Sequence, residues 1–175
     1  MIRFELEPAI AILGRTPAAL NTLLRGLPDA WIRANEGPGT WSPFDVVGHL
    51  VHGERTDWIP RAEIIRAHGE ARAFEPFDRH AQFRESAGKS IGDLLGEFEA
   101  LRARNLAVAG GWKLGPADLS RTGRHPDLGA VTLGQLLSTW VVHDLAHLGQ
   151  ITRTMAKQHA AEVGPWKAYF RVLEG

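Results

Sequence analysis

Residues 139–151 read TWVVHDLAHLGQI, and this stretch places two histidines, His143 and His147, four residues apart. In an α-helix, side chains at i and i+4 point in the same direction, one above the other. The apolar residues of that helical face form a stripe in which the two histidines fill the gap: Leu133, Leu136, Trp140, Ile151 and Met155. Because an imidazole is costly to bury without a partner, two of them in such a stripe indicate a shared partner. A divalent metal ion satisfies two neutral imidazoles at once, so the spacing predicts a metal site.

The amino-acid composition excludes several classes of protein and limits which residues can bind a metal ion. The 175 residues carry 20 basic and 20 acidic side chains, so the net charge is zero. The charge therefore gives no reason to expect binding to nucleic acid or to an anionic membrane surface. No apolar stretch reaches about 18 residues, and the start MIRFELEPAI lacks the pattern of a signal peptide. We therefore expect a cytoplasmic protein with one domain over residues 1–175. Because the chain has no cysteine, metal ligands must be imidazole or carboxylate.

Helical periodicity dominates the chain, whereas strand-like alternation is absent over any useful length. Four regions show apolar residues at three- and four-residue spacing: about 6–27 with a break at Thr16–Pro17, 42–67 with a kink at Pro60, 90–109, and 132–160. N-cap signals begin the second region at Ser42, with Asp45, and the fourth at Thr132, with Gln135. The pattern predicts an all-α four-helix bundle in which residues 68–89 form a long crossover between helices 2 and 3.

Two further segments are expected to lie outside these helices. Glycine and proline residues predict a loop that includes the run from Arg121 to Gly129. The tail carries Trp166, Tyr169 and Phe170, and we expect this aromatic end to pack back on the bundle.

A complete metal site needs a third ligand from another helix, because Zn²⁺ and similar ions are usually bound by at least three protein ligands. His49 is the leading candidate, since it shares one side of its helix with Val46 and Gly53. His52, three residues on, is the alternative, either as a ligand, as a supporting residue or as a partly exposed polar residue. Gln150 lies one turn beyond His147 and is expected within reach of the site.

Other polar residues receive more than one interpretation. Glu54 and Asp57 are predicted to be solvated or salt-bridged, with ligand orientation or general-base action as the alternative. His125 is either a turn residue or part of a pocket mouth, and Asp144 is assigned a structural hydrogen bond because it points about 100 degrees away from His143. The remaining histidines are expected to be solvated: His68, His80 and His159.

The order of these motifs resembles the DinB/YfiT-like family of metalloenzymes. The resemblance rests on Trp41-Ser42-Pro43, on GHLVHGERTDW at residues 48–58, and on HDLAHLGQI at residues 143–151. The resemblance extends along nearly the whole chain. The HDxxH element at residues 143–147, combined with WSP at residues 41–43 and HL at residues 49–50, is fairly specific for this family.

The resemblance implies a four-helix bundle with one long crossover, often dimeric, so we expect a homodimer. It implies a divalent ion, such as zinc or nickel, on His49, His143 and His147. From their positions in the sequence, we expect His52, Asp57, Gln150 and His125 to be supporting or pocket residues. Related branches are transferases that use bacillithiol or mycothiol, and the three-histidine set resembles the DinB or the bacillithiol-transferase type. The expected function is therefore thiol-dependent transfer to a small electrophilic molecule. A metal-dependent hydrolase that activates water and a non-catalytic, metal-stabilised bundle are the alternatives.

Overall fold

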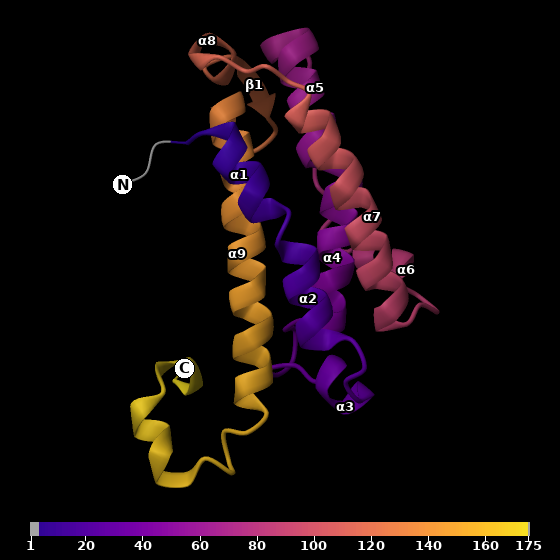
Figure 1. Cartoon of the computed structure of the whole chain (residues 1–175), viewed down its shortest axis with the longest axis vertical. Coiled ribbons are helices and arrows are strands. Elements are labelled where there is room, and N and C mark those ends of the chain that lie inside the picture. The colour runs from indigo at the N-terminus through magenta and orange to yellow at the C-terminus, as the bar shows by residue number, and fades with distance from the viewer. Residues whose placement is uncertain (1–3, 175) are drawn as a thin grey trace.

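The computed structural model describes residues 4–174, and most of them are helical (Figure 1). The α-helices are α1 (Leu6–Leu13), α2 (Thr16–Leu24), α3 (Asp29–Ile32), α4 (Pro43–Thr56), α5 (Trp58–His68), α6 (Ala81–Glu85), α7 (Ile91–Gly110), α8 (Pro116–Leu119) and α9 (Leu133–Lys157). Short 3-10 turns are η1 (Gly69–Ala71), η2 (Gly164–Tyr169) and η3 (Arg171–Leu173). A two-stranded antiparallel hairpin consists of β1 (Thr122–His125) and β2 (Gly129–Thr132).

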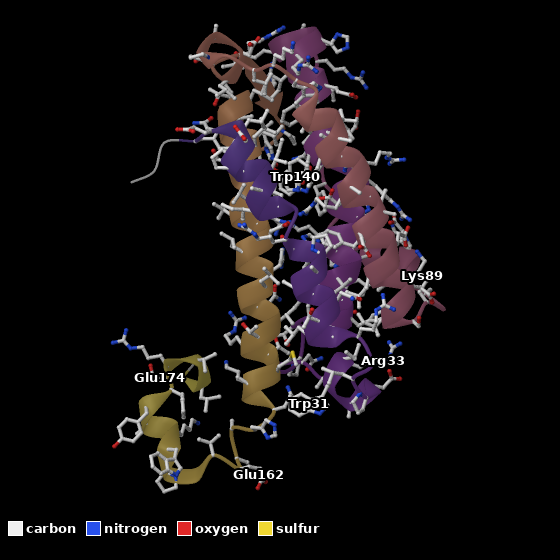
Figure 2. All side chains as sticks on the ribbon, in the orientation of Figure 1. Trp31, Arg33, Lys89, Trp140, Glu162 and Glu174 are labelled. Carbon is white, nitrogen blue, oxygen red and sulfur yellow. The ribbon has the colours of Figure 1, made fainter. Side chains whose placement is uncertain are left out.

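Four rods form the bundle. Two rods are pairs of consecutive helices, α1 with α2 and α4 with α5, and the other two are the single helices α7 and α9. Their contacts confirm the predicted four-helix architecture, because α7 packs on α4, and α9 packs on α1, α4 and α5. Two apolar clusters fill the interior, and the second contains Trp140, which lies inside the bundle (Figure 2). The Trp140 ring stacks on Trp58 with ring centroids 5.9 Å apart. No helix among residues 4–174 is both long enough and apolar enough to cross a membrane.

The predicted helix starts are confirmed by their caps. Ser42 accepts from the backbone N–H of Asp45, whose carboxylate accepts from the backbone N–H of Ser42. Thr132 and Gln135 form the same reciprocal pair at the start of α9. These bonds satisfy helix N–H groups that have no partner within the helix, so both starts are defined locally.

The second rod is interrupted one turn before Pro60, the proline at which a kink was predicted. The helix breaks at Asp57, and Pro60 lies in the first turn of α5. Proline has no N–H to bond the carbonyl oxygen of residue i−4, here Thr56, so it favours a break in the preceding turn. A proline is tolerated in the first turn of a helix because the N–H groups of that turn have no partner within the helix. The crossover between α5 and α7 exists as expected, but it also contains η1 and α6.

The prediction of a loop over residues 121–129 was wrong in part, because β1 and β2 pair from Thr122 with Thr132 to His125 with Gly129. The strands read TGRH and GAVT, and neither sequence alternates clearly between apolar and polar residues. The hairpin lies against α5 at Gly123, where a Cβ would lie 2.5 Å from Cγ1 of Ile65.

The prediction that the aromatic tail packs on the bundle was also wrong for its rings. Trp166 and Tyr169 are 68% and 78% exposed, and Phe170 is exposed as well. Figure 1 shows the segment after α9 turning away from the bundle, which it contacts through η3 and the buried side chain of Leu173. The helices already fill both clusters of the core, and two short 3-10 turns do not form a continuous apolar face.

Candidate metal centre

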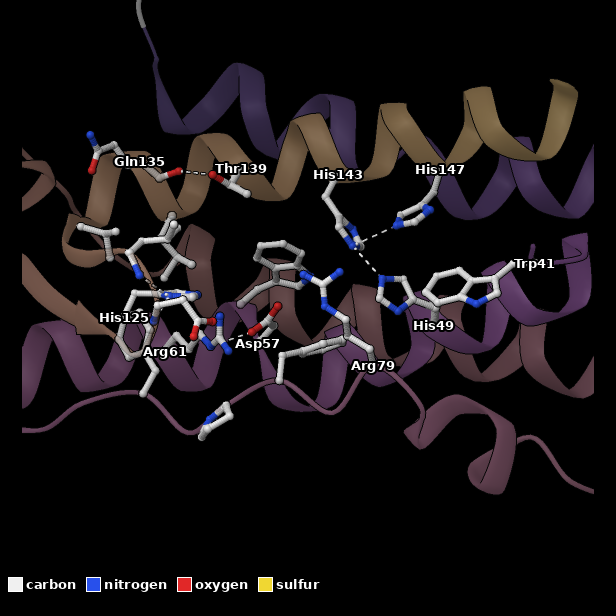
Figure 3. A pocket seen from close by; sticks show the side chains of 18 residues that line it. Trp41, His49, Asp57, Arg61, Arg79, His125, Gln135, Thr139, His143 and His147 are labelled. Carbon is white, nitrogen blue, oxygen red and sulfur yellow. Dashed lines mark hydrogen bonds and ion pairs between the residues drawn. The ribbon is translucent and has the colours of Figure 1, made fainter. Parts of the chain in front are cut away.

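Three histidines from two helices meet in the middle of the bundle. His49 comes from α4, and His143 and His147 come from α9 (Figure 3). The Nε2 atom of His143 lies 3.0 Å from Nε2 of His49 and 3.1 Å from Nε2 of His147. One nitrogen from each ring lies within 4.8 Å of the others, so the three side chains are close enough to bind one metal ion.

The donor atoms fit a divalent transition metal. At a metal–nitrogen distance of about 2.0–2.1 Å, two imidazole nitrogens of a tetrahedral site lie roughly 3.4 Å apart. The separations of 3.0 and 3.1 Å differ from that value by a few tenths of an ångström. Three neutral nitrogen ligands also suit zinc, nickel, copper or iron.

Burial keeps these histidines in the form that binds metal. Loss of hydration is the main cause and the neighbouring imidazoles contribute, and together they lower the pKa of His49 to about 3 and that of His143 to about 2. Burial also lowers the pKa of His147. All three rings are therefore neutral near pH 7, and each can offer a nitrogen lone pair.

One ligand has a supporting hydrogen bond. Nδ1 of His147 lies 2.8 Å from Oε1 of Gln150, so the ring donates its Nδ1–H and leaves Nε2 free to bind an ion. Nδ1 of His49 and Nδ1 of His143 have no hydrogen-bond partner among residues 4–174. Their rings are held by aromatic contacts instead, His49 by Trp41 at 4.8 Å and His143 by Trp58 at 5.0 Å between ring centroids.

His52 lies apart from the three-histidine cluster. It is buried, its Nδ1 lies 3.1 Å from Oε1 of Glu85, and its ring stands edge-on to Phe77. Of the alternatives for His52, the partly exposed polar residue is therefore wrong. The side chains of His49 and His52 are offset by about 60 degrees around α4. Both rings contact Phe77, but His49 reaches His143 on α9 whereas His52 reaches Glu85 on α6. The three histidines expected to be solvated, His68, His80 and His159, are exposed.

Glu54 and Asp144 belong to a buried ion-pair network between the helices. The Arg102 guanidinium is 1% exposed, donates to Glu54 at 2.9 Å, and donates to both oxygens of Asp144 at 2.6 and 2.9 Å. Trp140 Nε1 donates to Glu54, and the Thr16 hydroxyl donates to Asp144. The expected structural role of Asp144 is confirmed, but its main partner, Arg102, was not foreseen.

A pocket of about 530 Å³ opens beside the three histidines, between α4–α5 and α9 (Figure 3). Of the predicted supporting residues, Asp57 and His125 line it, whereas His52 and Gln150 do not. Asp57 pairs with Arg61 at 2.6 Å; burial raises the pKa of its carboxyl, and Arg61 opposes that rise.

Several residues that line the pocket were not foreseen from the sequence: Trp58, Arg61, Phe77, Arg79 and Thr139. One signal was available, because Gln135, Thr139, His143 and His147 repeat every four residues and all four line the pocket.

Comparison with known proteins agrees with this fold. The structure is similar to that of YfiT from Bacillus subtilis, described as a probable metal-dependent hydrolase with an unusual four-helix bundle topology. The match has a TM-score of 0.77 and 22% identity and covers 90% of each chain. It is also similar to TT2238, a four-helix bundle protein, with a TM-score of 0.56, 23% identity, and coverage of 85% of this chain and 98% of that one.

A search of curated proteins found no match. The family model of the DinB superfamily, however, matches residues 12–151, which include all three histidines and most of the bundle. The chain therefore belongs to the DinB superfamily.

Proposed function

We propose that this protein is a metal-dependent enzyme that holds one divalent ion on His49, His143 and His147 and acts on a small molecule in the adjoining pocket. The observation that carries the proposal is the convergence of three neutral Nε2 atoms at the wall of a pocket. Three protein ligands and an open position are typical of catalytic rather than closed structural sites. When bound, such an ion lowers the pKa of a coordinated water or thiol and polarises a substrate oxygen.

The residues of the chain prepare the pocket for this chemistry. The three imidazoles bind without adding charge, and the hydrogen bond from His147 to Gln150 orients one of them. Trp41 and Phe77 flank His49 at 4.8 and 5.4 Å between ring centroids, which limits the access of water to that side of the site. The site therefore combines an open face toward the pocket with an apolar surround.

Hydrolysis is the reaction class that we propose first. The structurally similar YfiT is described as a probable metal-dependent hydrolase, and hydrolysis needs only water as the second reactant. Thiol-dependent transfer is the second candidate. It is supported by the family resemblance and by the pocket volume of about 530 Å³, which gives room for a thiol beside an electrophile.

A purely structural metal is less well supported, because the helices are already joined without one. Arg102 links α7 to Glu54 on α4 and to Asp144 on α9 through buried hydrogen bonds. This network spans the same helices as the three histidines. We therefore assign the ion a chemical role.

The first experiment is elemental analysis of protein purified without a histidine tag, with four single alanine variants. We expect about one divalent ion per chain, lost in His49→Ala, His143→Ala and His147→Ala. His52→Ala is the matched control and should keep the ion, since His52 lies outside the cluster. Full metal content in His143→Ala would contradict the site.

The second experiment separates the two reaction classes. Activated aryl esters and alkyl halides are supplied to the metal-loaded protein with and without a low-molecular-weight thiol. Hydrolysis predicts turnover without thiol that is abolished by chelation, and transfer predicts turnover that requires thiol. Turnover that survives both chelation and His143→Ala would exclude the proposed centre from either reaction.

We also propose that the protein forms a homodimer. Val142 and Leu145 are large apolar residues on α9, and both are exposed although the helix is otherwise part of the bundle. They lie three residues apart and so share one face of the helix. Light scattering should give the mass of a dimer, and Leu145→Asp should shift it to the monomer; a monomeric wild type would refute the proposal.

A further inference from the structure

The pocket extends well beyond the three histidines, along one row of residues on α4–α5 and another on α9. On α4–α5, His49, Asp57 and Arg61 follow each other at multiples of four residues and line the same pocket. A helix rises about 1.5 Å per residue, so the backbone of Asp57 lies roughly 12 Å from that of His49. Figure 3 shows His125 and Arg61 at one end and the three histidines at the other. A ligand that fills the pocket therefore has two separated ends.

The end remote from the histidines, formed by Asp57, Arg61 and His125, is here called the distal polar end. The Arg61 guanidinium is largely buried, pairs through Nε with Asp57 at 2.6 Å, and donates from Nη2 to the backbone oxygen of Glu75 at 3.2 Å. It also lies over the ring of Phe74, 5.2 Å from the centroid. Arg61 Nη1 has no hydrogen-bond partner among residues 4–174. The guanidinium is thus held in place, and its Nη1 group is available to donate a hydrogen bond to a ligand.

His125 adds a donor of defined orientation. Its Nδ1 accepts from the backbone N–H groups of Asp127 at 3.1 Å and Leu128 at 3.2 Å, in the turn between β1 and β2. An imidazole nitrogen that accepts hydrogen bonds carries no proton, so the proton of the neutral ring is on Nε2. The hairpin thus presents His125 at the pocket wall as a hydrogen-bond donor.

The charges at this end offset each other. Asp57 and Arg61 form a neutral pair, whose carboxylate opposes an anionic ligand group and whose guanidinium opposes a cationic one. The other charged residues of the pocket are Arg79 and Asp127, and both are exposed. The positive charge of Arg79 contributes to the lowered pKa of His49, which lies at the opposite end of the pocket. Two free donor groups beside a carboxylate therefore suit a neutral group that both accepts and donates.

We propose that the distal polar end recognises an uncharged group of the substrate, a primary carboxamide or a hydroxyl, while the opposite end of the same molecule reacts at the three histidines. This inference rests on the proposed function and adds the substrate class. The pocket lining also includes the buried apolar side chains of Trp58, Phe74 and Leu136, so we expect the body of the molecule to be apolar. The substrate is an elongated molecule with a reactive group at one end and a neutral polar group at the other.

The test uses synthetic chains of about ten atoms that carry a hydroxamate, which chelates divalent metals, at one end. The other end is a carboxamide, a carboxylate, an ammonium or a methyl group. Isothermal titration calorimetry on the Zn²⁺-loaded protein should show the carboxamide compound binding at least tenfold more tightly than each of the other three. The same series with a methyl ester in place of the hydroxamate, titrated into the metal-free protein in the presence of a chelator, tests the distal polar end without metal chelation or ester hydrolysis.

Two variants and one control locate the effect. His125→Asn keeps an acceptor for the turn N–H groups but removes the Nε2–H donor, and Asp57→Asn removes the carboxylate charge. Both should reduce the carboxamide preference at least threefold, and Asp57→Asn should improve carboxylate binding. Glu63→Gln makes the same acid-to-amide change on the exposed side of α5 and should leave all affinities unchanged. Circular dichroism verifies that each variant is folded.

The outcomes separate this inference from the proposed function. Equal affinities for the four end groups, in both series, would overturn recognition at the distal polar end even if the hydroxamates bind the metal tightly. A carboxamide preference in the ester series, without any gain from the hydroxamate, would instead contradict the metal centre and leave distal recognition standing. Tighter binding of the carboxylate or the ammonium compound would refute the assignment of a neutral group.

Discussion

The side chain of Gln150 accepts a hydrogen bond from Nδ1 of His147 across 2.8 Å, one helical turn further along α9. Such a bond fixes the tautomer and the orientation of a metal-binding imidazole, and its loss typically weakens metal binding by about 10- to 100-fold. Gln150→Leu is therefore expected to lower zinc affinity by about this factor, measured by competition with a chelating dye. Gln158→Leu, an exposed glutamine just after α9, is the control. Unchanged affinity in Gln150→Leu would show that packing alone orients the ring.

The stability of the metal-free protein should depend on pH through the three histidines. Burial lowers the pKa of His49 to about 3 and of His143 to about 2 from an ordinary value of 6.5, and lowers that of His147. Below about pH 6.5 the unfolded chain therefore binds more protons than the folded one, and stability falls as the pH drops. The linkage slope reaches up to ~1.4 kcal/mol per pH unit for each histidine.

Urea titrations in the presence of a chelator between pH 5 and 7 measure this slope. Above about pH 7 the three rings are neutral in both states and add no pH dependence. His143→Gln removes one of the groups and should make the slope shallower than in the wild type. A wild-type slope that His143→Gln leaves unchanged would contradict burial of a neutral ring at this position.

The Arg102 network should be one of the most sensitive points of the fold. Arg102→Ala leaves Glu54 and Asp144 buried without their shared cation, and breaking a buried ion pair in this way costs about 3–5 kcal/mol. Arg104→Ala removes an exposed arginine from the same helix and should change the free energy of unfolding by no more than about 0.5 kcal/mol. Chemical denaturation compares the two. Similar small losses would mean that the carboxylates find other partners.

Two glycine substitutions should have opposite effects on stability. At Gly123 a Cβ would lie 2.5 Å from Ile65 and 3.2 Å from Phe74, so Gly123→Ala should push the hairpin from α5 and cost about 1–3 kcal/mol. At Gly96, inside α7, a Cβ meets no heavy atom within 4 Å among the described residues. Gly96→Ala should therefore stabilise the protein by about 0.5–1 kcal/mol. Thermal denaturation of both variants tests the pair, and a neutral Gly123→Ala would show that the hairpin can shift freely.

Helix positions and the part of the candidate site on α9 could be predicted from local sequence, because their causes are local. The caps at Ser42 and Thr132 are bonds between residues three positions apart. The pairing of His143 with His147 follows from the helical repeat, and so does the reach of Gln150 to His147. Spacing alone sufficed for these features, since the interacting atoms belong to one turn of one helix.

Features that depend on how the rods pack were decided by the tertiary structure. Whether His49 or His52 joins the pair on α9 depends on the rotation of α4, which directs His49 to α9 and His52 to Glu85 at the end of α6. The hairpin was missed because its strands are short and are held by contacts with residues far away, such as the bond from the Phe74 N–H to the Arg124 oxygen.

The sequence by itself thus determined the four helical rods and the pair of histidines on the last one. The tertiary structure decided the third histidine, the Arg102 network and the distal polar end of the pocket. The physical reason is that helix caps and i,i+4 contacts are short-range along the chain, whereas Arg102 and Asp144 are 42 residues apart and His49 and His143 are 94 apart. Such long-range pairs form only when burial of apolar surface sets the relative rotation of whole helices.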